Sequence, residues 1–145
     1  RIAASDKRTS FVGSHFFYED VSGRGTGEDL HELTETTDKF FVVKNSPKDP
    51  DNVEFSSYTV WIDKNTFLPV KAEYFDKSGK KYRLVEALEV KDIQGFTTVT
   101  KSKVTDLTNG GETISEFKDV EYNMGLKETL FSERYLRKAP REVRR

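Results

Sequence analysis

A serine and two histidines are the residues whose chemistry could be catalytic. Ser14 directly precedes His15, and such a pair can supply a nucleophile and its general base. Adjacent side chains rarely meet in that geometry, however, and the chain has no Gly-x-Ser-x-Gly turn that would expose the serine. His31 lies in a different segment, and neither histidine has further nitrogen or sulfur ligands at a metal-binding spacing. The sequence therefore predicts no catalytic residue and no metal ligand.

Gly23, Gly25 and Gly27 could in principle line a phosphate-binding loop. The segment lacks the lysine and hydroxyl residue of a Walker motif, and its spacing differs from the Gly-x-Gly-x-x-Gly of dinucleotide-binding folds. We interpret it as a mobile loop, because glycine raises the backbone entropy that a fixed structure must overcome. The chain has no cysteine, which excludes disulfides, thiolate catalysis and cysteine-zinc sites. No cofactor is expected.

Composition excludes a second class of function. The formal net charge of -1 argues against a nucleic-acid-binding protein, because phosphate neutralisation requires a basic surface. Charged residues make up 34% of the chain and hydrophobic residues 34%, so much of any sheet must present a polar face to water. The 145 residues are the size of one domain, which we expect to span the whole chain. Because the chain starts at Arg1 instead of Met, we expect it to be a processed or truncated piece.

The remaining residues indicate strands more than helices. Tyr58 to Ile62 are β-branched or aromatic, a composition typical of a strand, and a polar loop follows them. Residues 28–35 fit helix or strand by pattern alone, and we favour strand. The sequence predicts a mainly β protein with one curved, antiparallel, up-and-down sheet and one or two short helices. The expected strands are residues 28–35, 39–45, 58–62, 70–75, 80–90, 96–107 and 112–124, and the expected helices are residues 14–21 and 127–138.

The turn at residues 76–79 sets the expected register of the central hairpin. Asp-Lys-Ser-Gly is typical of a three-residue loop that ends on a left-handed glycine. It places Tyr74 opposite Tyr82 and Ala72 opposite Leu84, on an apolar face, and leaves Arg83 on the opposite, wet face. Two interpretations of the apolar face stay open: a core filled by its own side chains, or a partly open cleft for an apolar ligand. The residues predicted to line this face are Val70, Ala72, Tyr74, Tyr82, Leu84, Leu88 and Val90.

Four segments resemble a known family. They are rich in turn and core residues and run through nearly the whole chain: Phe11–Val21, Trp61–Glu73, Tyr74–Lys80 and Leu130–Leu136. In these segments the chain resembles the bacterial outer-membrane lipoprotein-sorting proteins, the LolA-like family, over the later two thirds of a typical member. One residue departs from the family pattern, which usually has Asp at the position of His15.

The resemblance implies a periplasmic, non-enzymatic protein with an incomplete LolA-like barrel of about seven strands. The first strands and covering helices of a typical member would precede Arg1. A protein of this kind carries lipid or the acyl chains of lipoproteins on the concave face of its sheet. The alternative is an adaptor domain that binds a protein partner, such as an exporter of the resistance-nodulation-division (RND) type. Neither function involves nucleic acid or metal.

Overall fold

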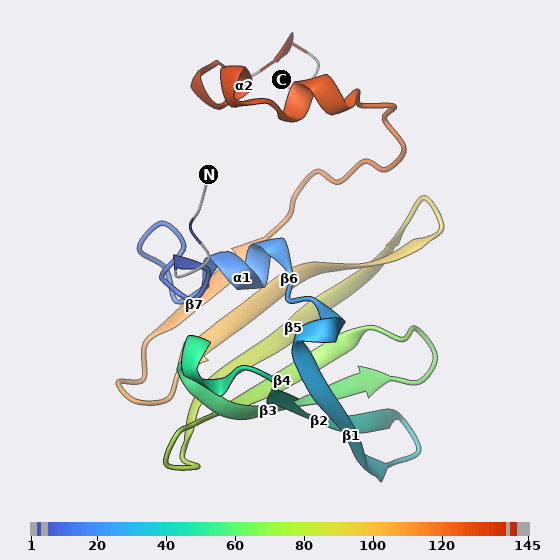
Figure 1. Ribbon diagram of the computed structural model, residues 1–145. Coiled ribbons are helices and arrows are strands. Elements are labelled where there is room, and N and C mark those ends of the chain that lie inside the picture. The colour runs from blue at the N-terminus through green and yellow to red at the C-terminus, as the bar shows by residue number, and fades with distance from the viewer. Residues whose placement is uncertain (1–2, 4–5, 139, 142–145) are drawn as a thin grey trace.

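The computed structural model describes residues 3, 6–138 and 140–141. The strands among them form one open antiparallel sheet (Figure 1). Each strand pairs with its neighbours in sequence, in the order β1 to β7. Within the described residues β1 and β7 are not paired with each other, so the sheet is an unclosed barrel of seven strands, as predicted. The strands are β1 (Asp29–Thr36), β2 (Phe40–Pro47), β3 (Phe55–Asp63), β4 (Pro69–Asp76), β5 (Lys81–Ile93), β6 (Phe96–Asp106) and β7 (Glu112–Glu116).

Two short α-helices accompany the sheet. The helix α1 (Tyr18–Ser22) lies against the sheet, whereas α2 (Glu133–Arg137) stands away from it at the end of an extended segment (Figure 1). Both are shorter than predicted. The C-terminal helix is interrupted at Ser132, whose φ of -97° and ψ of 159° are extended, and the residues before it form a separate 3-10 turn. The 3-10 turns are η2 (Thr26–Glu28), η3 (Pro50–Asn52) and η4 (Glu128–Phe131).

The loop between β4 and β5 has the predicted conformation. Gly79 has a φ of 81°, in the left-handed region that glycine adopts without steric cost. The Asp76 N–H donates to the Lys80 carbonyl at 2.9 Å, and the Asp76 carboxylate accepts from the backbone N–H of Ser78 and of Lys80. Local turn chemistry therefore fixes this hairpin loop.

The predicted register beyond the loop is wrong by one residue. A β-bulge at Tyr82 places Tyr74 opposite Arg83 and Ala72 opposite Val85. Because side chains alternate between faces, Leu84 lies on the opposite face of the sheet, paired with Glu73. Arg83, expected in water, is only 2% exposed. The bulge lets the Tyr82 hydroxyl reach Glu54 while Arg83 turns towards α1, and sequence alternation alone does not encode either contact.

Further irregularities divide β5 and β6. Pairing shifts between Ala87 and Glu89, so that Leu88 is an extra residue in β5, and shifts again between Glu89 and Val90. The expected last strand, residues 112–124, ends at Glu116. Phe117 N–H donates to the Thr100 carbonyl, and Lys101 with Glu116 is the final pair. Asn123 and Gly125 then have positive φ values, which a continuous strand does not allow.

We call the face of the sheet that α1 covers the inner face. Residues paired across neighbouring strands share a face, and one row of such residues crosses the inner face from β2 to β6: Val43, Val60, Ala72, Val85 and Val104. Few apolar side chains of the described residues are buried. They are Val42, Phe55, Tyr74 and Val104, counted over both faces of the sheet.

Candidate functional site

A cavity of about 370 Å³ lies on the inner face between α1 and strands β3 to β6. This volume is within the range of roughly 300–1,000 Å³ that is usual for small-molecule sites. The sheet supplies an apolar floor, and the segment around α1 supplies a charged rim that includes Arg8, Glu19 and Arg24. The floor residues are Val60, Val70, Ala72, Val85, Ala87 and Val99. The inner face is therefore not completely filled by its own side chains.

Three of the seven residues predicted to line the apolar face do line the cavity. These are Val70, Ala72 and Tyr74. Tyr82 is the bulge residue and Leu84 lies on the outer face, so the prediction for Leu84 is wrong. Leu88 is the extra residue of the second irregularity in β5, and Val90 follows it. They are 46% and 40% exposed, and neither is among the cavity-lining residues.

Sequence reasoning missed four of the floor residues. Val85 and Ala87 lie on the inner face only because of the bulge at Tyr82, which reverses the faces of the β5 residues that directly follow it. Val99 reaches the inner face through the irregularity in β6. Val60 could have been found, because it pairs with Ala72 in the expected hairpin of β3 and β4.

Glu19 of α1 is the centre of the charged rim, because it pairs with both Arg8 and Arg24. Its carboxylate accepts from Arg8 Nη1 at 2.8 Å and from Arg24 Nη1 at 3.2 Å, and the residue is only 4% exposed. A buried carboxylate is costly unless it is paired. The two guanidinium groups satisfy one oxygen each, and so hold α1 in place between the segments that carry them.

Arg24 also ties the loop after α1 to the start of the sheet. Its Nε and Nη2 donate to the two carboxylate oxygens of Asp29, both at 2.8 Å, in the bidentate geometry favoured by arginine. The Tyr58 hydroxyl donates to the same carboxylate at 2.7 Å. Burial acts to raise the pKa of Asp29, but the hydrogen bonds from Arg24 and Tyr58 outweigh it, and the pKa lies below its ordinary value. Burial and the bond to Asp29 raise the pKa of Tyr58.

Arg8 joins the N-terminal segment to the residue before β3. Its guanidinium donates through Nε and Nη2 to Glu54, which also accepts from the Tyr82 hydroxyl at 2.7 Å. Burial acts to lower the pKa of Arg8, but the hydrogen bond and the charge of Glu54 raise it above its ordinary value. The group lies 5.0 Å from the ring centroid of Phe55, within reach of a cation–π interaction.

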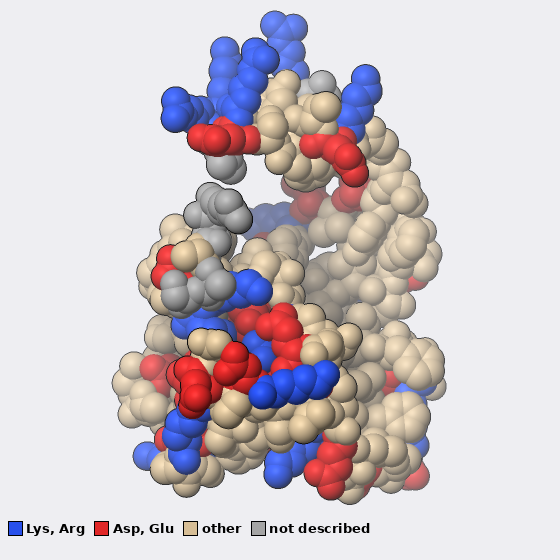
Figure 2. Space-filling view, viewed as in Figure 1, with Lys and Arg blue, Asp and Glu red and all other residues tan. Residues whose placement is uncertain are grey.

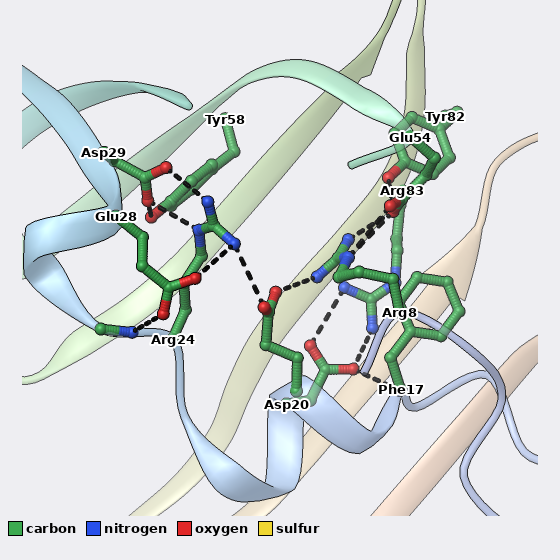
Figure 3. A network of polar contacts seen from close by, with 12 residues as sticks. Arg8, Phe17, Asp20, Arg24, Glu28, Asp29, Glu54, Tyr58, Tyr82 and Arg83 are labelled. Carbon is green, nitrogen blue, oxygen red and sulfur yellow. Dashed lines mark hydrogen bonds and ion pairs between the residues drawn. The ribbon is translucent and has the colours of Figure 1, made fainter. Parts of the chain in front are cut away.

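Arg83 completes the rim from the sheet side. It donates to both carboxylate oxygens of Asp20 on α1 and to the carbonyl of His15. Its guanidinium lies 4.3 Å from the ring centroid of Phe17, and Asp20 accepts from the Phe17 N–H at 2.6 Å at the start of α1. Figure 3 shows the three arginines converging on carboxylates of α1 and its neighbours. This arrangement positions a helix; it leaves no described rim carboxylate unpaired that could act as a general base.

The part of the chain that the structure describes contains no group of three or more His, Cys, Asp or Glu side chains that could hold a metal ion. Nor does any described helix have the length and apolar composition needed to cross a membrane.

The open antiparallel sheet with a cavity on its inner face is a LolA-like fold. The family model that matches residues 1–138 carries the description "Uncharacterized protein", and the chain belongs to this family. The structure resembles a crystal structure described as an outer membrane lipoprotein-sorting protein domain, from Vibrio parahaemolyticus. The TM-score is 0.83 and the identity 26%, over 95% of this chain and 60% of that one. A search of curated proteins gave no match.

Two other solved structures have the same fold. A DUF1329 family protein from Desulfovibrio piger has a TM-score of 0.81 and 26% identity, over 94% of this chain and 59% of that one. A LolA superfamily protein from Nitrosomonas europaea has a TM-score of 0.60 and 20% identity, over 86% of this chain and 61% of that one. The chain thus spans about 60% of the length of these structures. The predicted LolA-like resemblance and the open antiparallel barrel are confirmed.

Proposed function

We propose that this protein is a periplasmic, non-enzymatic carrier that binds a lipid, or an acyl chain of a lipoprotein, in the cavity on the inner face. The observation that carries the proposal is the cavity itself, because six aliphatic side chains from four strands form its floor. The LolA-like fold supports the proposal, since the similar Vibrio protein is described as a lipoprotein-sorting domain.

The physics of acyl-chain binding agrees with such a floor. Burial of apolar surface contributes roughly 25 cal/mol per Å² and requires no directional contact. A chain laid along Val60, Val85 and Val99 would cover side chains that the protein itself leaves uncovered. The charged residues of the rim are engaged with one another, which supports binding over catalysis as the activity of this site.

Native mass spectrometry tests the proposal. The chain is purified without detergent and incubated with 1-oleoylglycerol, and the fraction of 1:1 complex is measured over a range of lipid concentrations. We expect a saturable 1:1 complex. A mass that stays free of lipid at every concentration, both with this lipid and with 1-oleoyl-lysophosphatidic acid, would overturn the proposal.

Two variants of β5 form a matched pair for this test. Val85→Glu places a carboxylate on the cavity floor, where it opposes apolar burial, and should weaken binding at least about tenfold. Leu84→Glu places the same group on the outer face and should leave binding unchanged. Equal losses in both variants would show that the lipid does not bind on the inner face. Circular dichroism verifies that both variants fold.

The alternative from the sequence, an adaptor domain for an RND-type exporter, stays a prediction. The two functions predict different lipid binding by the isolated chain. A carrier binds lipid by itself, whereas an adaptor would remain free of lipid and would bind the purified exporter. The exporter is therefore the next binding partner to examine if the wild-type chain forms no lipid complex.

A further inference from the structure

The cations at the cavity all have carboxylate partners. Three positively charged residues line it: Arg8, Arg24 and Lys71. Both arginines pair with Glu19. The Lys71 ammonium lies 2.7 Å from a Glu73 oxygen and 4.4 Å from the ring centroid of Trp61. Glu73 and Trp61 lie on the outer face with Leu84, so the Lys71 ammonium points away from the cavity. An anionic group that entered the cavity would therefore meet Arg8 and Arg24, both already paired with Glu19.

Carboxylates outnumber guanidiniums in the rim. Three arginines, Arg8, Arg24 and Arg83, converge there. Five carboxylates are paired with them: Glu19, Asp20, Glu28, Asp29 and Glu54. Of these eight side chains, Arg8, Arg24, Glu19 and Asp20 line the cavity, so the charges that the rim presents to it balance and leave no cation in excess to attract an anion. Figure 2 shows acidic and basic side chains interspersed on this side of the molecule below the C-terminal segment, without a broad basic patch.

One nitrogen in the rim has no partner, but its location does not provide an anion site. Among the described residues, Arg83 Nε is the buried side-chain nitrogen without a hydrogen bond. Arg83 is only 2% exposed and is absent from the residues that line the cavity. Its two terminal nitrogens are already engaged by Asp20 and His15. A ligand in the cavity would have to displace Asp20 to reach this group.

We propose that the cavity selects lipids whose polar end is uncharged, such as acylglycerols, over lipids with the same acyl chain and a phosphate or carboxylate end. This inference rests on the proposed carrier function and names its ligand class. An anionic end would have to take an arginine from Glu19, leaving a carboxylate that is 4% exposed without one of its two partners. Hydroxyl and ester groups do not require this change.

The test compares two lipids that differ by one phosphate. The wild-type chain is titrated with 1-oleoylglycerol and with 1-oleoyl-lysophosphatidic acid, each below its aggregation concentration, with native mass spectrometry as the readout. We expect the acylglycerol to bind at least about fivefold more tightly, because the phosphate meets arginines that are already paired with carboxylates. A smaller ratio, or tighter binding of the phosphate lipid, would overturn the inference while the carrier function stands. If neither lipid binds, the carrier function fails and the inference fails with it.

A variant tests whether the rim causes the selectivity. Glu54→Gln removes one carboxylate and frees the Arg8 donors that it holds, so the ratio of the two dissociation constants should fall at least about threefold. Glu32→Gln removes the same charge from an exposed position on β1, away from the cavity, and should leave the ratio unchanged. An equal change in both variants, or no change in Glu54→Gln, would show that selectivity does not arise at the rim.

Discussion

Arg83 on β5 and Asp20 on α1 form an ion pair between residues 63 positions apart in the chain. Arg83 Nη1 donates to one carboxylate oxygen at 3.2 Å and Nη2 donates to the other. Asp20 in turn accepts from the Phe17 N–H and so caps the helix that the pair holds on the sheet. One contact therefore stabilises both the helix start and its position over the cavity.

We expect Arg83→Met to lower the free energy of unfolding by about 3–5 kcal/mol, because it leaves the Asp20 carboxylate without its counter-charge. Urea unfolding followed by circular dichroism measures the change. The double variant with Asp20→Asn should recover part of the loss, and the resulting double-mutant cycle gives the coupling between the two residues. Lys91→Met, which removes an exposed pair on the same strand, is the control and should have little effect on the free energy of unfolding. A cost as small for Arg83→Met would contradict the structural role.

Acid should unfold the protein in part through Asp29. Its pKa in the folded chain lies below the ordinary value, so the stability that it contributes is present above its unfolded pKa of about 3.9 and is lost as pH falls through the folded value. Unfolding free energies measured between pH 6 and pH 2.5 should therefore fall most steeply below about pH 4. In Asp29→Asn this slope should be shallower, although the variant is less stable at neutral pH. An unchanged slope would assign the acid sensitivity to other groups.

His31 should respond to pH in the opposite direction. Its Nδ1 faces the Asn45 side-chain oxygen at 2.6 Å and its Nε2 faces the Thr26 carbonyl at 2.8 Å, so both nitrogens have acceptors. The bonds to Asn45 and Thr26 raise the pKa of His31. The contribution to stability is present below the unfolded pKa of about 6.5 and is lost as pH rises through the folded value. An NMR titration of the His31 ring should give a pKa above 6.5. A value at or below 6.5 would show that the two ring nitrogens do not both donate to Asn45 and Thr26.

Phe55 should carry a large share of the core energy. It is fully buried, and its ring lies edge-on to Tyr58 and Tyr74 with centroid distances of 5.5 Å. Phe55→Ala should lower the unfolding free energy by about 3–5 kcal/mol through lost burial and the cavity left behind. Phe131→Ala, at a position 77% exposed, should change it by no more than about 0.5 kcal/mol. Similar midpoints for the two variants in urea would contradict this distribution of the core.

The elements could be predicted from the sequence where local chemistry determines them. The loop at Gly79 and the seven strands follow from turn residues and from β-branched and aromatic runs, and the open sheet agrees with the family resemblance. The last strand was predicted too long because the residues after Glu116 keep a strand-like composition, although Lys101 with Glu116 is the final pair of the ladder. The C-terminal helix was predicted as continuous because its residue pattern does not reveal the extended conformation of Ser132.

The site was less accessible to prediction because it depends on contacts distant in sequence. Alternation assigned Val70, Ala72 and Tyr74 to the apolar face, and in the structure these residues line the cavity. Alternation then failed at Tyr82, where a bond to Glu54 and the pair of Arg83 with Asp20 favour a bulged register. An arginine among alternating charged residues is normally expected to be exposed to solvent. Only the contact with Asp20 on α1 explains why Arg83 is buried.

The bulge at Tyr82 also has a consequence for the order of folding. The loop at Gly79 forms equally well with a regular ladder, which would put Leu84 inside and Arg83 outside. The observed register gains its advantage from Asp20 and Glu54, which lie outside the hairpin. We therefore expect β4 and β5, as an isolated peptide, to sample both registers, and to settle into the native one only after the N-terminal segment docks. In kinetic terms, docking of α1 selects the native register of the hairpin on which the helix rests.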